Sequence, residues 1–435
     1  MARGHQRYFC VQKSEEELLP RYLVVANTAL APDKIRRGND CVMRARLSDA
    51  SFFFEEDKKA DIEARVEKTA GIVFHARLGS VREKTARLEK LAANIAGKLG
   101  LAEGEAKACA RAAHLCKFDL VSLMVGEFPE LQGQMGRAYL LHHKEAPSVA
   151  DAVRDHYKPV SASDDLPARD VARVVALADR LDTLAGCFAV GLAPTGTADP
   201  YALRRNAIAA LRLLLEVGAN DTRWAKLALS DLLRDAYAGL GDRKLDLTAE
   251  QTVDKVMEFC GERLRGLLAT ATGNAAADAV LAGRAFVAER ERSVADQPAR
   301  ALFRAQGLAA ALASGSSWLA TARGVSKRLS GISKSHAPKL HAASEFAKSD
   351  ADRAKNEPIV NIVSRLDVVT RDLASRAAVD AALGEMQTVA EGLEKIFNET
   401  LVNDPADPLT GARLELLSHG AACMARIGDF ARLVS

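Results

Sequence analysis

From Ile62 onward, apolar residues recur at every third or fourth position along most of the chain. This spacing places them on one face of an α-helix. One such run extends from Leu88 to Leu99 and closes at Gly100, a residue type that commonly follows the last helical turn. Further runs extend from Ala106 to Met124 and from Val171 to Leu184. We therefore expect a mainly α-helical fold with these three helices packed at its centre.

The first 60 residues follow a different pattern. Between residues 7 and 27, the strand-like runs RYFCVQ and RYLVVAN flank the turn-prone KSEEELLP, which predicts a β-hairpin. Gly38-Asn39-Asp40 predicts a turn. Phe52, Phe53 and Phe54 follow, and a small hairpin cannot bury three such side chains by itself. We therefore predict that residues 1–60 are the C-terminal remnant of a β-containing domain.

The stretch from Ala112 to Tyr139 joins a buried helical segment directly to a turn. Its apolar spacing predicts a helix that continues through Met124 and ends with Gly126 as its C-cap. Pro129 is predicted to begin a second helix, because proline is well accommodated in a first helical turn. The intervening EFPELQG run predicts a shaped corner between the two.

Residues 209–435 are predicted to form a C-terminal helical region. Amphipathic runs extend over Leu227–Leu240, Val253–Leu268 and Ala276–Arg290, and helical periodicity resumes over 359–395. The segment from about 330 to 356 is polar and rich in small residues, so it is predicted to be a linker or flexible loop.

Composition limits the classes of function. A chain of 435 residues with 48% apolar residues is long enough for two or three globular domains. The net charge of +3 is too small to indicate nucleic-acid binding by itself, so any such role must depend on local basic clusters. The seven cysteines contain no CxxC pair, which argues against a zinc site or a disulfide framework and favours the cytoplasm. No apolar run is long enough to span a membrane.

Several motifs resemble one bacterial family. Residues 120–139 resemble the most characteristic segment of the β subunit of two-subunit glycyl-tRNA synthetases, and HQRYF, RLSDA, FFFEED and GLAPTGTADPYALRRNA also match this family. The similarity is closest over residues 42–207 and looser after 250, where IFNETLV replaces a Phe-Phe-Asp-centred motif. The family's β subunit is considerably longer at its N-terminus. The resemblance therefore implies that this chain corresponds to the C-terminal portion.

The helical skeleton of residues 61–215 also indicates a degenerate HD-type domain. Such domains hold a divalent metal with a histidine on the first helix, a His-Asp doublet on the second and an aspartate on the last. Here Lys84 occupies the first position, Cys116-Lys117 the doublet and Asp179 the last. An ammonium group cannot coordinate a cation, so we predict that this domain binds no metal.

Lysines at these positions suggest that the domain has changed from binding cations to binding anions such as a phosphate backbone. Two interpretations stay open: Lys84 and Lys117 contact RNA, or they lie on an ordinary solvated face. Arg204-Arg205 could likewise grip a phosphate or pair with acidic residues of the preceding helix, such as Asp179 and Asp182. The candidate tRNA-binding residues are Lys84, Lys117, Arg204, Arg205, Arg263, Arg265, Lys327, Arg328 and Lys334.

The resemblance implies the tRNA-binding β subunit of a glycine-tRNA ligase. In such a ligase a separate α subunit catalyses the ATP-dependent attachment of glycine to tRNA(Gly), within an α2β2 heterotetramer. It further implies that residues 216–435 contain a DALR-like, anticodon-binding helical bundle. The chain has no GxxxxGK[ST] motif or other nucleotide-binding motif. We therefore expect no catalytic residues and no cofactor in this chain, with ATP and Mg used through the α subunit, and neither DNA nor a membrane as a partner.

Two alternatives stay open. The chain could be a stand-alone tRNA- or RNA-binding module derived from this subunit. It could also be an HD-type phosphohydrolase, although such an enzyme needs the metal ligands that this sequence lacks.

Overall fold

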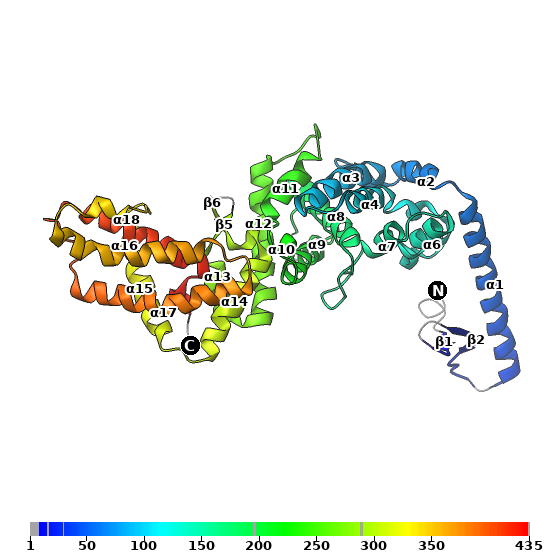
Figure 1. Cartoon of the computed structure of the whole chain (residues 1–435). Helices are drawn as coiled ribbons and strands as arrows, with labels where there is room; N and C mark the ends of the chain where they lie inside the picture. Colours follow the sequence, from blue (N-terminus) through cyan, green and yellow to red (C-terminus); the bar gives the residue numbers. More distant parts are fainter. Residues whose placement is uncertain (1–7, 15–16, 29, 195–196, 288–289, 434–435) are drawn as a thin grey trace.

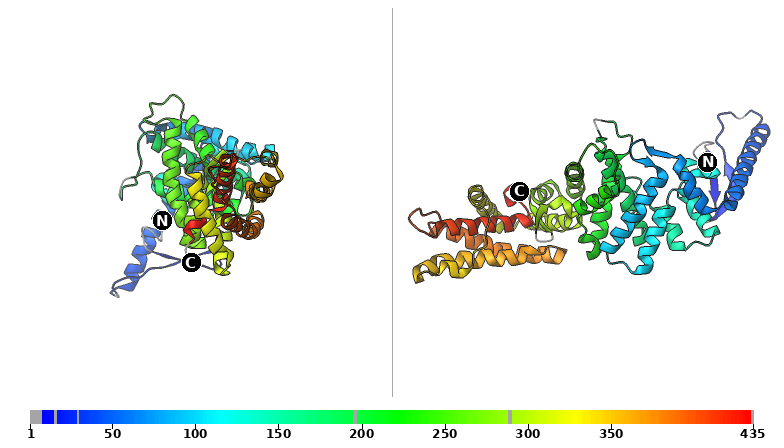
Figure 2. Two further views of the ribbon diagram at one scale, coloured as in Figure 1. Left: turned by 90° about the vertical axis from the view of Figure 1, so that its left-hand side faces the viewer. Right: turned by 90° about the horizontal axis from the view of Figure 1, so that it is seen from above.

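The computed structural model describes residues 8–14, 17–28, 30–194, 197–287 and 290–433. These residues form a mainly α-helical fold, as predicted, with three two-stranded antiparallel sheets. The molecule is elongated (Figure 1). A small hairpin and one long helix lie at one end, a helical body lies in the centre, and a helical bundle lies at the other end (Figure 2).

The predicted N-terminal hairpin is present as β1 (Phe9–Gln12) and β2 (Leu18–Leu23). The predicted turn at Gly38-Asn39-Asp40 is wrong, because these residues lie inside the long helix α1 (Pro32–Lys59). An isolated glycine costs a helix only about 1 kcal/mol. Instead, Asn39 accepts a hydrogen bond from the Tyr8 hydroxyl, and Asp40 accepts one from the Tyr22 hydroxyl, each at 2.5 Å. These two hydrogen bonds hold the hairpin against α1.

Asp57 attaches the C-terminal end of α1 to the central body. One carboxylate oxygen accepts hydrogen bonds from the Arg65 guanidinium (2.6 Å) and the Leu123 amide (3.0 Å). The other accepts from the Met124 amide (3.0 Å) and the Tyr139 hydroxyl (2.8 Å). The acidic end of the FFFEED run therefore has a structural role that its sequence alone did not indicate.

The central body is organised around α8 (Asp170–Ala189), of which 18 residues are buried. A helix buried on nearly all sides requires neighbours around its whole circumference. The helices of this body are α2 (Ile62–Lys68), α3 (Val81–Lys98), α4 (Glu103–Leu115), α6 (Gln134–His142), α7 (Pro147–Asp155), α9 (Leu203–Arg212), α11 (Leu229–Ala238) and α12 (Ala249–Thr272). Of these, α3, α4, α7, α9, α11 and α12 contact α8. The predicted central helices at 88–99 and 171–184 are confirmed.

The helix predicted to continue through Met124 ends at Leu115. Cys116 leaves the helical conformation (ψ 141°), and Lys117 then adopts a left-handed backbone conformation (φ 72°) that leads into a 3₁₀-helix. Gly126 is not a cap, because it lies inside the short helix α5 (Leu123–Glu127), which Phe128 caps. Pro129 does begin the next short helix.

The predicted corner is held by a buried carboxylate. Asp119 accepts hydrogen bonds from the amides of Gly133 (2.6 Å) and Gly136 (3.0 Å). A Cβ atom at Gly136 would lie 2.9 Å from a methyl group of Val153 and 3.1 Å from the Asp119 carboxylate. Both glycines of the LQGQMG run therefore permit a close approach of α6 to its neighbours.

No change of packing marks the predicted boundary between residues 215 and 216. Residues Leu213–Val217 form a π-helical turn that continues α9, and α11 and α12 beyond it still pack on α8. The helix predicted over Ala276–Arg290 is wrong after Leu281, where α13 (Asn274–Leu281) ends. A Cβ atom at Gly283 would lie 2.5 Å from the Ala425 carbonyl oxygen, so only glycine fits this contact. The strands β5 (Arg284–Val287) and β6 (Arg290–Ser293) follow.

The C-terminal end is a four-helix bundle joined to the centre by α14 (Pro298–Ala313). Its helices are α15 (Trp318–Ser333), α16 (Asp350–Arg371), α17 (Arg376–Glu399) and α18 (Thr410–Ile427). The segment predicted to be flexible includes the end of α15 and the start of α16. Between them, Phe346 is buried and His341 contacts Glu345 (2.9 Å) and Glu415 (2.7 Å), so this segment packs on the bundle. Among the described helices, none has a run apolar and long enough to cross a membrane.

Candidate nucleic-acid interface

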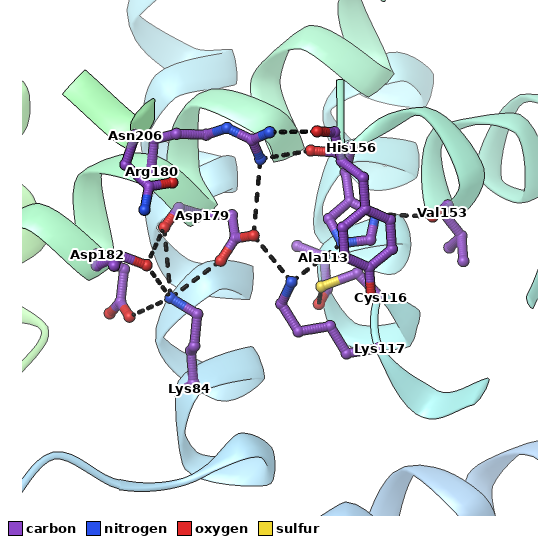
Figure 3. Close-up of polar contacts among 12 residues, drawn as sticks. Lys84, Ala113, Cys116, Lys117, Val153, His156, Asp179, Arg180, Asp182 and Asn206 are labelled. Carbon is purple, nitrogen blue, oxygen red and sulfur yellow. Dashed lines mark hydrogen bonds and ion pairs between the residues drawn. The ribbon is translucent and has the colours of Figure 1, made fainter. Parts of the chain in front are cut away.

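Two neighbouring helices bring charged side chains together inside the central body. Asp179 and Asp182 are one turn apart on α8, and Lys84 and Arg87 are one turn apart on α3, so each pair lies on one face of its helix. The start of α3 is fixed by a reciprocal cap between Ser80 and Glu83. We call the buried group formed by Lys84, Arg87, Lys117, His156, Asp179, Arg180 and Asp182 the lysine–aspartate cluster. Figure 3 labels all of these residues except Arg87.

Lys84 occupies the centre of one side of this cluster. Its Nζ atom lies 2.9 Å from Asp179 Oδ1 and 2.9 Å from Asp182 Oδ2, and it donates a hydrogen bond to Thr183 Oγ1 at 2.8 Å. It also lies 4.6 Å from the centre of the Phe74 ring. Burial by itself lowers the pKa of Lys84, but the two carboxylates outweigh it and raise this pKa above the ordinary value. Lys84 is therefore a charged ammonium group surrounded by oxygen atoms.

Lys117 reaches the opposite side of Asp179. Its Nζ atom lies 2.8 Å from Asp179 Oδ2 and 3.2 Å from His156 Nε2. The other ring nitrogen of His156 lies 2.7 Å from the Val153 carbonyl oxygen. Burial and the nearby Lys117 charge hold the pKa of His156 well below its ordinary value. The imidazole is therefore neutral, with Nδ1 donating to Val153 and Nε2 accepting from Lys117.

Two arginines complete the cluster. Arg87 contacts Asp182 through Nε (2.6 Å) and Nη2 (3.1 Å). Arg180 donates hydrogen bonds of 2.6 Å to the carbonyl oxygens of His156 and Tyr157. Four cations thus face two carboxylates, and backbone carbonyl groups and aromatic ring faces offset the excess positive charge. The arrangement is a closed ion network.

Three of the four residues at the HD positions meet in the structure. Lys84, Lys117 and Asp179 are far apart in the sequence yet within hydrogen-bond distance, and Lys84 lies among oxygen atoms as a bound cation would. Cys116 is not part of the cluster, since its thiol lies 3.1 Å from the Ala113 carbonyl oxygen, and burial raises its pKa to about 12.

The structure places Lys84 and Lys117 differently from both interpretations made from the sequence. Their side chains are buried and paired with carboxylates, so they form neither a solvated face nor a surface open to a phosphate. Sequence reasoning missed Arg87, His156 and Arg180. A signal was available for Arg87, which lies three residues after Lys84 and therefore on the same helical face.

Arg204 and Arg205 lie in the first turn of α9, as expected. Asp179 and Asp182, offered as their acidic partners, are engaged by Lys84, Lys117 and Arg87. Arg204 lies 4.0 Å from Asp199, and Arg205 is exposed.

The two arginines expected on α12 already have partners. The Arg263 guanidinium lies 3.5 Å from the Glu262 carboxylate and 3.4 Å from the centre of the Phe259 ring. Arg265 contacts Asp278 at 2.6 Å. The charges of both guanidinium groups are therefore partly neutralised, and such charges attract a phosphate less strongly than unpaired ones do.

The basic residues of the bundle are more accessible. Lys327 and Arg328 are exposed on α15, and exposed Lys334 follows the end of this helix. Among the described residues, no carboxylate forms a salt bridge with any of these three. Arg328 lies 5.6 Å from the centre of the Phe397 ring and 3.4 Å from Asn398. We call Lys327, Arg328 and Lys334 the α15 basic patch.

One group of residues in the bundle has metal-ligand chemistry. Asp367, His419 and Cys423 could offer three ligand atoms within 4.8 Å of one another. However, Asp367 already accepts hydrogen bonds from Arg426 (2.8 Å) and Arg371, and burial raises the pKa of the Cys423 thiol to about 12. Two guanidinium groups on the carboxylate repel a cation, so this group fits an ion pair better than a metal site.

Comparison with known proteins decides the family. The family model described as glycyl-tRNA synthetase beta subunit matches residues 1–282, which is more than half of the chain. The chain belongs to this family. The glycine–tRNA ligase beta subunits of Geobacter sp. strain M21 and Aromatoleum aromaticum are 37% and 39% identical over 99% of the chain. That of Neisseria gonorrhoeae strain FA 1090 is 35% identical over 99%.

The chain spans about three fifths of the length of these beta subunits, because the matches cover 59%, 58% and 58% of the three relatives. The family similarity extends through the lysine–aspartate cluster and into the bundle. The resemblance read from the sequence is therefore confirmed.

Proposed function

We propose that this chain is the tRNA-holding part of a glycine–tRNA ligase beta subunit in the cytoplasm. It supports the ATP-dependent attachment of glycine to tRNA(Gly) by a separate catalytic α subunit, within an α2β2 heterotetramer. The observation that carries this proposal is identity of 35–39% to glycine–tRNA ligase beta subunits over 99% of the chain. In this arrangement ATP and Mg are used through the α subunit, and this chain supplies helical surfaces without a bound metal or cofactor.

The geometry favours this role over that of an HD-type phosphohydrolase. A phosphohydrolase of this type needs a divalent metal at the HD positions. Here both carboxylate oxygens of Asp179 are engaged by the ammonium groups of Lys84 and Lys117.

The tRNA contacts belong on the exposed cations. A phosphate backbone is attracted most strongly by charges that no carboxylate already neutralises. The α15 basic patch meets this condition, and the Phe397 ring beside Arg328 adds an aromatic face. Exposed Arg205, with the half-buried Arg204 beside it, forms the second candidate surface. Lys84 and Lys117 are buried, so we do not expect them to contact tRNA.

Replacing Lys327, Arg328 and Lys334 together with alanine is expected to weaken tRNA binding and to flatten its salt dependence. Each lost phosphate contact should reduce the slope of log affinity against log salt concentration by about 0.7–0.9. Binding of glycine tRNA is measured by titration at several salt concentrations, with Arg204→Ala/Arg205→Ala as a second variant. Lys107→Ala is the control, because this exposed lysine is already paired with Glu103 at 2.6 Å. Unchanged slopes in both variants would remove both surfaces from the tRNA path.

The isolated chain is expected to give no glycine-dependent pyrophosphate exchange, because its sequence contains no nucleotide-binding motif. The intact two-subunit ligase from Geobacter sp. strain M21 serves as the positive control. Sustained exchange by the purified chain alone would contradict the proposed division of labour.

A further inference from the structure

Basic side chains are concentrated in one part of the C-terminal bundle. Residues 318–348 include six lysines and arginines but only one acidic residue, so this segment carries a net charge of +5, whereas the whole chain carries +3. The six are Arg323, Lys327, Arg328, Lys334, Lys339 and Lys348. Among the described residues, none of the six forms a salt bridge with a carboxylate. Such a segment attracts a polyanion.

The second half of this segment connects α15 to α16 and packs on α18. We call residues 335–349 the strap. The Ser418 hydroxyl donates a hydrogen bond to the His336 carbonyl oxygen at 2.7 Å. The Lys339 amide donates to the Glu415 carbonyl oxygen at 3.2 Å, and the Phe346 ring is buried. The backbone of the strap is therefore held against α18.

One histidine of the strap contacts two carboxylates. His341 is 4% exposed, and its Nδ1 atom lies 2.9 Å from Glu345 in the strap. Its Nε2 atom lies 2.7 Å from Glu415 on α18. A neutral imidazole has one N–H group and donates only one of these hydrogen bonds, whereas a protonated ring donates both. Only the protonated ring therefore joins the two carboxylates.

The same contact occupies the one acidic side chain of residues 318–348. Glu345 is exposed, and hydrogen bonds from His341 and then from the Ala342 amide hold the pKa of its carboxyl below the ordinary value. The carboxylate is directed at the ring and forms no salt bridge with Lys339 or Lys348. The positive charge of these two strap lysines is therefore left for another anion.

The facing turns of α16 and α18 carry further charged side chains, namely Asp350, Asp352, Arg353, Lys355, Arg413 and His419. Asp350 and Arg353 are exposed, and Asp352 accepts a hydrogen bond from Ser349. Lys355 and Arg413 both contact Asp407. His419 contacts Asp367 at 3.0 Å. Among the described residues, Glu345 and Glu415 are therefore the charged groups in contact with the His341 ring.

We propose that His341 is a positioning residue for tRNA binding. Its protonated ring holds the strap in place, so that Lys339 and Lys348 extend the α15 basic patch as a surface for RNA phosphates. This role rests on the proposed function and adds to it two contacts and their regulation by pH. Lysines that are already held in place bind without the entropy cost of ordering a loose segment. When the ring loses its proton, one hydrogen bond is lost and a nitrogen lone pair faces a carboxylate, so the strap loosens and tRNA binding weakens.

The first test uses the full 435-residue chain without RNA. Hydrogen exchange is measured between about pH 5.5 and 8.5 and expressed as protection factors, which removes the intrinsic effect of pH. Protection of residues 335–349 is expected to fall as pH rises, whereas α8 should keep its protection. His341→Gln should give low protection of the strap at every pH. Glu345→Gln changes an exposed position, so it should reduce the pH dependence without disturbing the fold.

His142→Gln is the matched control for the hydrogen-exchange test. This exposed ring contacts His143 and, among the described residues, no carboxylate. Its replacement should therefore leave the protection of the strap and its pH dependence unchanged.

The second test measures binding of glycine tRNA at the two ends of this pH range. Lys339→Ala/Lys348→Ala is expected to reduce the slope of log affinity against log salt concentration by about 0.7–0.9 for each lysine. His341→Gln should weaken binding about five- to tenfold at the acidic end and little at the basic end. Added to Lys339→Ala/Lys348→Ala, it should have no further effect, because it acts through these lysines. Lys59→Ala/Lys107→Ala is the control, since both lysines are paired with glutamates.

Protection of the strap that does not change with pH would overturn the proposal. Equal weakening by His341→Gln with and without the two strap lysines would also overturn it, because that result indicates a purely structural role. Either outcome, in a chain that still binds tRNA, contradicts the positioning role alone. A wild-type chain that bound no tRNA at low salt would instead contradict the proposed function, and the positioning role with it.

Discussion

Replacing Asp179 with asparagine is expected to lower the free energy of unfolding by about 3–5 kcal/mol. Among the residues that the structure describes, the substitution leaves Lys84 with one carboxylate partner and Lys117 with none, although both ammonium groups stay buried. A buried charge without its partner costs much more than the pair gains when it is intact. Urea unfolding followed by circular dichroism measures the change.

Asp278→Asn is the matched control for this experiment. It removes the same carboxylate chemistry from an exposed pair with Arg265, so its effect should be much smaller. A loss below about 1 kcal/mol for Asp179→Asn would show that the lysine–aspartate cluster does not stabilise the central body.

The carboxylates of Asp179 and Asp182 are also expected to make the free energy of unfolding depend on pH. Burial opposes ionisation of Asp179 and Asp182, but the neighbouring cations outweigh it and hold both pKa values below the ordinary value, that of Asp179 well below. A depressed folded-state pKa stabilises the fold fully above the unfolded-state pKa of about 3.9. This contribution is lost as pH falls from there through the folded-state values. The difference in stability between the wild-type chain and Asp179→Asn should therefore shrink progressively in acid.

Replacing Arg413 with methionine is expected to cost about 3–5 kcal/mol of unfolding free energy. Arg413 is fully buried and donates hydrogen bonds to Asn356 (2.7 Å), the Val402 carbonyl oxygen (3.1 Å) and Asp407 (2.5 Å). Methionine fills a similar volume but leaves these three acceptors, including that of buried Asn356, without this donor. Lys355, followed by Arg413, holds the pKa of Asp407 well below its ordinary value, so this carboxylate is ionised in the wild-type chain.

Hydrogen exchange should locate the damage caused by Arg413→Met. Residues 400–409 and the start of α16 are expected to exchange faster, whereas α8 should keep its wild-type protection. Arg413→Lys retains the charge but loses the forked geometry, so it should recover only part of the stability. Equal stability of the methionine variant and the wild-type chain would show that packing alone holds this end of the bundle.

Periodicity predicted the central helices because burial on one face imposes its spacing directly on the sequence, as the apolar run from Leu88 to Leu99 shows. Periodicity could not predict that the helix stops before Lys117. The left-handed conformation of Lys117 accompanies contacts with Asp179 and His156, which are distant in the sequence. The local turn signal at Gly38-Asn39-Asp40 was likewise misleading. In the folded chain, Asn39 and Asp40 lie in a helix and accept hydrogen bonds from tyrosines of the hairpin.

In the candidate site, too, the sequence pattern could not reveal contacts between residues that are distant in the chain. Motif spacing correctly brought Lys84, Lys117 and Asp179 together, but spacing does not reveal whether a lysine faces solvent or a carboxylate. That choice depends on Asp182, one turn after Asp179 on α8, and on His156, which follows the end of α7. Partners that meet only after folding carry no local sequence signal.

The position of Lys84 has a thermodynamic consequence. A metal ion stabilises a folded protein by an amount that rises with the concentration of the free ion, so such a protein weakens when the ion is scarce or chelated. The cation between Asp179 and Asp182 is covalently attached to α3 and is present in every molecule at a ratio of one. The contact between α3 and α8 is therefore independent of dilution, of chelators and of the cell's supply of metal ions.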